Sequence, residues 1–336
     1  MIIRSIAPLR ISFAGGGTDI SEYSREYGGA VINSTINWYA HTHLAPSKEG
    51  IRLISLDFGT NEKLEHLVYD GKNDLVKATL KKMELGKLRG GAELFMHTDA
   101  PPGSGLGSSS TVVVSLIGAL SNWLDIFMSE YDVAELAYEI ERNELGIKGG
   151  YQDQFASVFG GFNYIEFATD GKVIVNPLRI SNENIKELEC HLLLCFTGGT
   201  RLSANIIERQ VDDFRSGRNV EALHEQKRMA LEMKNSLLKG DFDEFGRMLD
   251  SAWQTKKEMA RGITNSRIDG LYEAARQKGA IGGKILGAGG GGYLLLYCSY
   301  RTRHDVERTM HSMGADSKPF SFAKDGLKVW RTKNEF

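Results

Sequence analysis

Residues 101–110 read Pro-Pro-Gly-Ser-Gly-Leu-Gly-Ser-Ser-Ser and are followed by an apolar segment with helical spacing. Glycines at alternate positions can adopt left-handed backbone angles and let the main chain pass close to a ligand. The serines then open a helix, where free N–H groups and the helix dipole favour an anion such as phosphate. We therefore predict a phosphate-binding loop made of Gly103, Ser104, Gly105, Leu106, Gly107, Ser108, Ser109 and Ser110.

Other known phosphate-binding patterns do not fit the sequence. The sequence contains no GxxxxGK motif followed by serine or threonine, which excludes a P-loop nucleoside triphosphatase. Asp125 follows Gly107 by eighteen residues, as in a dinucleotide-binding fold, but the glycine spacing differs and the loop lies a hundred residues into the chain. Residues 57–59 read Asp-Phe-Gly as in protein kinases, without the catalytic-loop and lysine motifs of those enzymes. An ordinary glycine loop with a serine cap remains the structural alternative.

The composition bounds the class of protein. The chain has 336 residues, 41% of them hydrophobic, and a net charge of -2, so neither a nucleic-acid nor a membrane partner is expected. The cysteines at 190, 195 and 298 lack zinc-ligand spacing and suit free thiols in a reducing cytoplasm. The N-terminus does not read as a signal peptide, and no run of 18 apolar residues occurs. We expect a cytoplasmic protein.

Helical and strand patterns alternate in mixed order, which predicts an α+β fold. Strands are predicted at 2–14, 30–45, 51–58, 91–97, 190–197, 281–286, 293–298 and 318–331, and helices at 74–86, 108–124, 132–145, 302–313 and over most of 203–278. The composition changes near residue 180, which divides the chain into predicted domains at 1–185 and 186–336. Because no linker marks this boundary, we expect the domains to share a broad interface.

Three motifs in order resemble those of the GHMP kinases, the family of galactokinase and mevalonate kinase. The loop at 101–110 resembles their second motif, residues 7–19 (APLRISFAGGGTD) resemble a galactokinase-type opening, and residues 284–293 (KILGAGGGGY) resemble their third, glycine-rich motif. The resemblance implies a ribosomal S5 domain 2-like, ATP-binding N-terminal domain and a ferredoxin-like C-terminal domain. It also implies that Gly289 and Gly290 lie beside the ATP phosphates.

The same resemblance suggests a catalytic set for phosphoryl transfer, which needs charge neutralisation and a group to accept the hydroxyl proton. Residues 141–155 resemble the family segment in which a helical glutamate binds magnesium and an aspartate twelve residues later faces the acceptor hydroxyl. By this resemblance Glu141 and Ser109 bind Mg²⁺, Asp153 is the catalytic base, and Arg10 lies close to the transferred phosphoryl group.

The residues themselves leave alternatives to these roles. On an ideal helix Glu144 lies nearer than Glu141 to the centre of the apolar stripe at 133, 136, 137 and 140, so geometry alone does not exclude it as the metal ligand. Asp153 could instead be the N-cap of a helix that starts at Gln154. Arg10 could form a surface salt bridge from a strand.

Resemblance to a subgroup of the family narrows the choice of acceptor sugar. Gly16 and Gly17 stand where galactokinases have a glutamate and a histidine, so galactose is not expected. The opening resembles that of heptose 7-phosphate kinases and of the kinase part of fucokinases, which act at the anomeric hydroxyl. Gly16, Gly17 and Asp19 would then bind the sugar.

Two further stretches, at 196–203 and 250–257, resemble the heptose kinases. A phosphorylated acceptor needs cationic and hydroxyl donors. We expect its distal phosphate at Arg201, Ser203, Lys256 and Lys257, although the two lysines could simply be solvated on a charged helix.

The expected function is ATP- and Mg²⁺-dependent phosphorylation of the C1 hydroxyl of a sugar phosphate, D-glycero-D-manno-heptose 7-phosphate. A fucokinase-like enzyme for an unphosphorylated sugar is the first alternative. A non-catalytic nucleotide and sugar sensor is the second, and the paired carboxylates Glu141 and Asp153 argue against it. The expected partners are ATP and the sugar phosphate, and a homodimer is left open.

Overall fold

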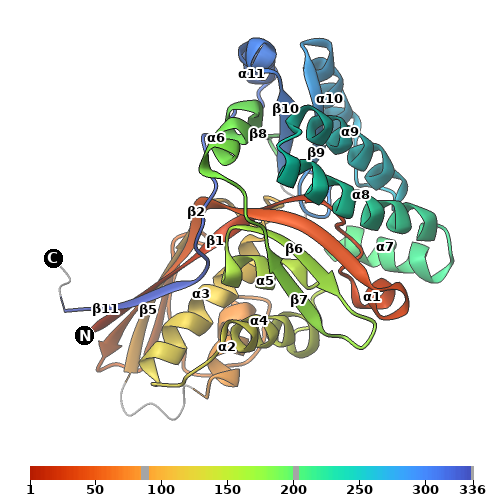
Figure 1. Ribbon diagram of the computed structural model, residues 1–336. Helices are drawn as coiled ribbons and strands as arrows, with labels where there is room; N and C mark the ends of the chain where they lie inside the picture. Colours follow the sequence, from red (N-terminus) through yellow and green to blue (C-terminus); the bar gives the residue numbers. More distant parts are fainter. Residues whose placement is uncertain (85–90, 200–203, 334–336) are drawn as a thin grey trace.

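Two long antiparallel strands, β1 (Ile2–Ala14) and β2 (Gly29–Ser47), run through the centre of the molecule (Figure 1). The computed structural model describes residues 1–84, 91–199 and 204–333. Most side chains of β1 and of the first half of β2 are buried on both faces, which explains their near-continuous apolar sequence. These two strands therefore contribute to both halves of the fold.

The larger sheet has the order β11-β1-β2-β5-β3-β4, with β6 paired to the first half of β2 and β7 paired to β6. Its other strands are β3 (Ile51–Ser55), β4 (Thr60–Lys63), β5 (Gly91–Thr98), β6 (Phe162–Phe167), β7 (Val173–Pro177) and β11 (Lys328–Thr332). The helices of this half are α1 (Ser21–Tyr27), α2 (Asp74–Lys82), α3 (Ser108–Trp123), α4 (Glu130–Tyr138), the π-helix η2 (Glu139–Glu144) and α5 (Gln152–Phe159). α3 packs directly on β1 and β2, and α2, α4 and α5 lie around it (Figure 1).

The second half contains a three-stranded antiparallel sheet in the order β8-β10-β9. Its strands are β8 (Leu192–Phe196), β9 (Ala280–Ile285) and β10 (Tyr293–Cys298), and its helices are α6 (Asn182–His191), α7 (Ala204–Arg215), α8 (Val220–Lys239), α9 (Phe242–Glu258), α10 (Ser266–Gln277) and α11 (Tyr300–Ser312). Residues 316–318 lie on the free edge of β8, where Phe196 N donates to Asp316 O at 3.0 Å and Lys318 N to Leu194 O at 2.8 Å. This order of strands and helices is the β-α-β-β-α-β pattern with α7–α10 in the first crossover.

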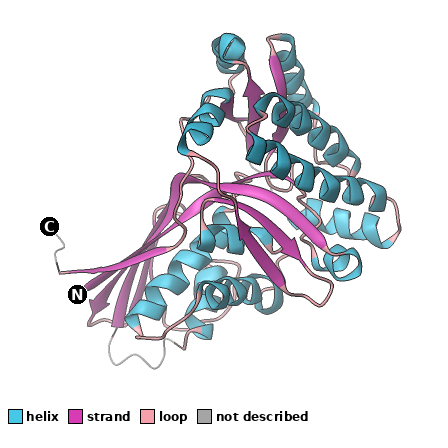
Figure 2. Cartoon of the chain, in the orientation of Figure 1, coloured by secondary structure: helices cyan, strands magenta, loops and turns pink. Residues whose placement is uncertain are grey.

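The two halves share an apolar core, as the missing linker predicted. Leu9, Ile11 and Phe13 of β1 pack in one cluster with Met229 and Met233 of α8. Figure 2 shows the helices of the second half resting on the long strands of the first. Within the described part of the chain, no helix has the length and apolar character needed to cross a bilayer.

The end of the chain differs from the prediction. A strand was predicted over 318–331, but only Lys328–Thr332 forms one. Residues 319–327 run between the two sheets and make a single isolated bridge, at Phe322, so they have no continuous strand partner. There β11 pairs antiparallel with β1, Thr332 opposite Ile2. The boundary at 185/186 stays a prediction, with the qualification that α6 runs across it and that the last strand belongs to the N-terminal sheet.

Candidate active site

The predicted phosphate-binding loop leaves the end of β5 and turns into α3. Gly103, Gly105 and Gly107 all have positive φ, at 75°, 83° and 77°, as their placement at alternate positions predicted. Gly107 is the N-cap of α3, so the free N–H groups of this 16-residue helix open onto the loop. The prediction that this loop binds phosphate fits its backbone shape.

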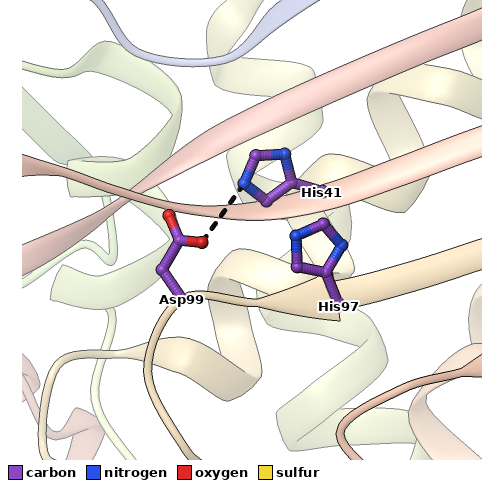
Figure 3. Close-up of side chains that lie close together, drawn as sticks. All are labelled: His41, His97 and Asp99. Atoms are coloured by element: carbon purple, nitrogen blue, oxygen red, sulfur yellow. Dashed lines mark ion pairs between the residues drawn. The ribbon is translucent and has the colours of Figure 1, made fainter.

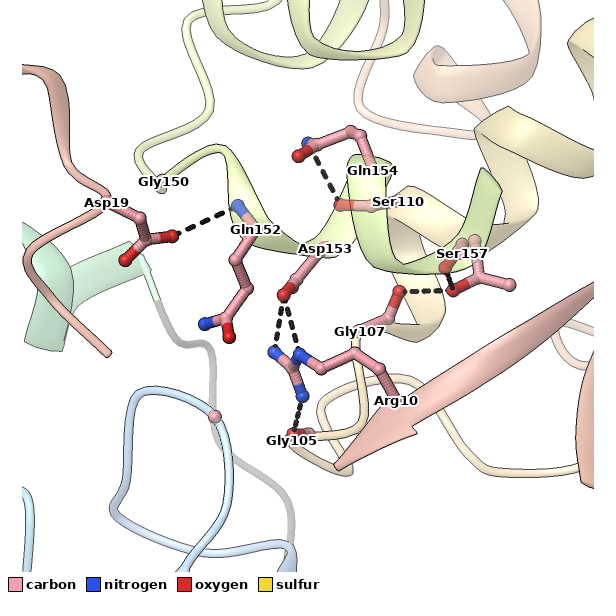
Figure 4. A network of polar contacts seen from close by, with 12 residues as sticks. Arg10, Asp19, Gly105, Gly107, Ser110, Gly150, Gln152, Asp153, Gln154 and Ser157 are labelled. Carbon is pink, nitrogen blue, oxygen red and sulfur yellow. Dashed lines mark hydrogen bonds and ion pairs between the residues drawn. The ribbon is translucent and has the colours of Figure 1, made fainter. Parts of the chain in front are cut away.

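Arg10 and Asp153 form the centre of the site, although 143 residues separate them in the chain (Figure 4). Nε and Nη2 of Arg10 lie 2.7 Å and 2.6 Å from Oδ1 of Asp153. Nη1 of Arg10 donates to the carbonyl of Gly105 at 2.6 Å, and its backbone N–H donates to the carbonyl of Leu106 at 3.0 Å. Arg10 is 3% exposed, so the surface-salt-bridge alternative is wrong. This arginine joins the phosphate loop to the predicted base.

Asp153 lies in the first turn of α5, behind Gly107. The N-cap of that helix is Tyr151, with no side-chain cap, so the alternative role of Asp153 as an N-cap is wrong. A Cβ on Gly107 would lie 3.3 Å from Cγ of Asp153 and 3.4 Å from Cγ of Arg10. Glycine at 107 therefore allows the loop to lie directly against the ion pair.

The two glutamates considered as metal ligands both lie in the π-helix η2, and their side chains have different surroundings. Glu141 is buried, its Oε2 accepts from the side-chain amide of Gln154, and that amide also donates to Oγ of Ser110 at 3.1 Å. Glu144 faces away and accepts from Tyr69 Oη at 2.7 Å and from Lys81 Nζ at 3.3 Å. Geometry therefore favours Glu141 over Glu144. Ser109, the other predicted ligand, is exposed in the first turn of α3.

Asp19 marks the end of the site where the sugar was predicted. It is nearly buried, and its Oδ1 and Oδ2 accept from the backbone N–H groups of Gly17 at 3.0 Å and Gln152 at 3.2 Å. Burial and the nearby Asp153 carboxylate raise the pKa of Asp19. Because Gln152 is the neighbour of Asp153, a hydroxyl bound near Asp19 would be close to the predicted base.

The two glycines that were predicted to bind the sugar differ in how closely they are packed. Gly17 has a φ of 97°, and a Cβ there would lie 2.4 Å from the Met259 side chain. Gly16 is more open, since a Cβ would lie 3.8 Å from Ser12 Oγ and 3.9 Å from Gln152 Nε2. The positive φ and the close contact with Met259 explain why only glycine fits at position 17. Gly16 lies next to the site.

The glycine-rich loop of the second half closes over the phosphate-binding loop. A Cβ on Gly287 would lie 2.6 Å from Cα of Gly105, and one on Gly292 would lie 2.3 Å from the carbonyl of Ser104. Gly289 and Gly290, predicted to contact phosphates, pack against Ile263, whose carbonyl accepts from Gly290 N at 2.8 Å. The ends of this loop thus meet the other domain, and its middle is held by residue 263.

Comparison with protein families identifies the same two regions. The family model for the GHMP kinases N terminal domain matches residues 74–161, which include the phosphate-binding loop. The model for the GHMP kinases C terminal domain matches residues 233–316, which include the glycine-rich loop. The chain belongs to the GHMP kinase family.

Several relatives of this GHMP kinase act on sugars. It is 39% identical to D-glycero-alpha-D-manno-heptose 7-phosphate kinase of Campylobacter jejuni, over 98% of this chain and 99% of the relative. It is 34% identical, with a TM-score of 0.83, to the crystal structure of a D-glycero-D-manno-heptose 1-phosphate kinase of Bacteroides thetaiotaomicron, which covers 99% of this chain and 100% of that one. It is 27% identical to the L-fucokinase/L-fucose-1-P guanylyltransferase of Bacteroides fragilis, over 88% of this chain and 34% of the relative. The protein is an ATP-dependent sugar kinase.

The predicted distal-phosphate residues have different surroundings. Arg201 and Ser203 lie outside the described residues. Lys256 is buried, and its Nζ donates to the carbonyl of Ile285 at 2.9 Å and to that of Gly287. The side chain of Lys256 is therefore not solvated. Its hydrogen bonds go to backbone carbonyls of the glycine-rich loop and the strand before it, so it supports this loop of the GHMP kinase. Lys257 is half-buried, with its Nζ 5.7 Å from the centre of the Trp253 ring.

A second buried lysine was not predicted as part of the site. Nζ of Lys284 donates to the carbonyl of Phe13 at 2.8 Å. Burial, followed by the charge of Arg10, lowers the pKa of Lys284 to about 7. Burial, with Lys284 and Arg10, also lowers the pKa of Lys256 well below its usual value. Arg10, Lys256 and Lys284 thus form a buried group of basic side chains next to the loops of this GHMP kinase.

Sequence reasoning also missed two glutamines that connect the predicted residues. Gln154 joins Glu141 to Ser110, and Gln152 contacts Asp19 through its backbone. Both flank Asp153, so the polar run Gln-Asp-Gln at the start of an otherwise apolar helix could have indicated them.

Proposed function

We propose that this sugar kinase transfers the γ-phosphoryl group of ATP to the C1 hydroxyl of D-glycero-D-manno-heptose 7-phosphate. The observation that carries the proposal is the ion pair of Arg10 and Asp153 between the phosphate-binding loop and Asp19. The sugar itself is suggested by the name of the 39% identical relative, which matches nearly the whole chain.

In this proposal each residue of the site has a separate role. Asp153 accepts the proton of the C1 hydroxyl, and Arg10 holds the carboxylate in place through Oδ1. The guanidinium of Arg10 also adds fixed positive charge beside the loop, where negative charge spreads over the transferred group. Asp19 and the turn at Gly16 and Gly17 orient the sugar.

The metal ion proposed for this site is Mg²⁺. Carboxylate, hydroxyl and amide oxygens surround the first turn of α3, and the buried Oε1 of Gln154 accepts no hydrogen bond from the described residues, so the donor set suits a hard cation. Glu141 and Ser109 would hold the ion, which would neutralise part of the charge on the ATP phosphates.

The distal phosphate of the acceptor would be bound by Arg201, Ser203 and Lys257. The segment that precedes Arg201 in the chain lies next to the glycine-rich loop, since Thr197 N donates to the carbonyl of Gly292 at 3.0 Å. A cytoplasmic location is part of this proposal, and the oligomeric state is left open.

The test is a panel of acceptors assayed by ADP release. The two heptose kinase relatives differ in the position of the phosphate in their names, so the panel contains heptose 7-phosphate, heptose 1-phosphate and unphosphorylated heptose. We expect kcat/KM to be highest with heptose 7-phosphate. Preference for heptose 1-phosphate would contradict the proposed acceptor.

The fucokinase similarity supports a second candidate, an enzyme for an unphosphorylated sugar. Fucose and galactose therefore belong in the same panel. Highest kcat/KM with fucose would favour this candidate. ATP binding without turnover of any acceptor would favour a sensor.

A further inference from the structure

A group of polar side chains on the outer face of the larger sheet has no role in the proposed reaction. His41 of β2 and His97 of β5 are direct cross-strand partners. Their rings are stacked, with centroids 4.2 Å apart and planes 4° from parallel (Figure 3). Thr42, the next residue of β2, is buried toward α3, where its Oγ1 accepts from Ser115, so His41 faces the opposite side.

Asp99 completes the group. It follows His97 by two residues at the end of β5, and Figure 3 shows its carboxylate beside one nitrogen of His41. Oδ1 of Asp99 lies 3.5 Å from Nε2 of His41, and Oδ2 accepts from the backbone N–H of Tyr39 at 2.8 Å. One oxygen is thus fixed by the backbone while the other is directed toward the imidazoles.

We propose that His41, His97 and Asp99 bind one divalent transition-metal ion of the zinc class. Their ligand atoms all lie within 4.8 Å of one another. A tetrahedral zinc ion with bonds of about 2.1 Å needs ligand atoms about 3.4 Å apart. Because a metal lies in the plane of each imidazole that binds it, the two stacked rings must turn out of their stack to share one ion. Two imidazoles and a carboxylate suit zinc and leave its fourth position open to water or a solute.

The ring of His97 offers a nitrogen that has no other partner in the described part of the chain. Nδ1 of His97 is buried and accepts or donates no hydrogen bond among the described residues. An imidazole nitrogen without a hydrogen-bond partner is available as a metal ligand.

This metal site would lie at the start of the phosphate-binding loop, apart from Glu141. Asp99 is followed directly by residues 100–107, and the Thr98 hydroxyl beside it donates to the carbonyl of Ala100 at 2.8 Å. An ion held by Asp99 and the two strands would fix the point where the loop leaves the sheet.

The test is calorimetric titration of the chelator-treated full chain with zinc chloride, without nucleotide. We expect saturable binding of one ion per chain that millimolar Mg²⁺ does not displace, because imidazole is a poor ligand for Mg²⁺. His97→Ala and Asp99→Asn should each weaken binding by about tenfold or more, since loss of even an outer-shell partner costs about that much. The amide oxygen introduced by Asp99→Asn could still accept from the Tyr39 N–H, so this variant should keep the fold.

His43→Ala is the matched control, because His43 lies two residues along the same face of β2 but outside the cluster. It should bind zinc as tightly as the unchanged protein. Cobalt should in addition give the absorption of a tetrahedral ion, lost in His97→Ala. Absence of saturable zinc binding, or equal binding by the unchanged protein and both cluster variants, would overturn the proposal and leave only a surface ion pair of His41 and Asp99.

Discussion

Arg10 contacts Asp153 through two nitrogens and the carbonyl of Gly105 through the third, so one buried side chain links the predicted base to the phosphate-binding loop. A lysine could not make the two-nitrogen contact with the carboxylate in the same fixed geometry, because it lacks the planar fork of arginine. The separation of the base from the loop is therefore set by Arg10.

Replacing Asp153 with asparagine should abolish most of the turnover. The variant keeps a side chain of the same shape but cannot accept the proton, and general bases of this kind contribute about a hundredfold to ten-thousandfold. ADP release should fall by that factor while ATP binding, measured by calorimetry, stays close to that of the unchanged protein. Near-normal turnover would remove Asp153 from the mechanism.

The two glutamates of η2 can be distinguished by Mg²⁺ titration. Glu141→Gln should raise the Mg²⁺ concentration that gives half-maximal activity, because a buried carboxylate near Ser110 is lost. Glu144→Gln is the control, since its partners Tyr69 and Lys81 lie outside the site. If the glutamine at 144 had the larger effect on the Mg²⁺ requirement, the assignment would have to be exchanged.

Gly107→Ala and Gly146→Ala separate backbone strain from damage to the site. Both glycines have positive φ, at 77° and 65°, so each substitution should cost about 1–2 kcal/mol in the free energy of unfolding. Only the alanine at 107 meets Asp153 and Arg10, whereas nothing lies within 4 Å of a Cβ at 146. We expect kcat to fall in Gly107→Ala alone. Equal kcat values in the two variants would show that the close packing at 107 is unimportant.

Lys284 should make stability depend on pH. Its folded-state pKa of about 7 lies below the usual 10.5, so between these values the unfolded chain binds a proton that the folded chain does not. The free energy of unfolding should therefore rise with pH above about 7, because the penalty for burying the charge disappears. Urea unfolding at about pH 7 and pH 9 should show this rise in the unchanged protein and a smaller one in Lys284→Met. The same rise in both proteins would assign it to other groups.

The local parts of the fold could be predicted from the sequence. The helix predicted from 108 begins at Ser108, because glycine and serine chemistry fixes both the loop and the helix start over a few residues. The end of the chain could not be predicted in the same way. The pairing of β11 with β1 depends on contacts between opposite ends of the chain, which no local pattern reveals.

The order of Glu141 and Glu144 shows where helical periodicity fails. On an ideal α-helix Glu144 lies nearer the apolar stripe, but η2 has wider turns, with Leu145 N donating to the carbonyl of Ile140 at 3.1 Å. The wider turn rotates Glu144 outward and leaves Glu141 inside. Only the resemblance to the family, and not the pattern, favoured the residue that the structure buries.

For Lys256, in contrast, helical periodicity correctly indicates that the side chain is buried. Phe245, Leu249, Ala252 and Trp253 form the buried stripe of α9, and residue 256 continues it. The helical phase therefore places Lys256 inside and Lys257 at the edge. Its charge suggested a solvated or ligand-binding side chain, but the carbonyl oxygens of Ile285 and Gly287 satisfy it within the fold.

The most direct test of the proposed reaction is phosphorus NMR of the product formed from heptose 7-phosphate and Mg-ATP. The account predicts a second phosphorus signal, coupled to the anomeric proton, that grows as ADP forms and is absent with Asp153→Asn. A new phosphate on another carbon, or no new sugar phosphate while ATP is bound, would contradict the assignment of C1 as the acceptor and of Asp153 as its base.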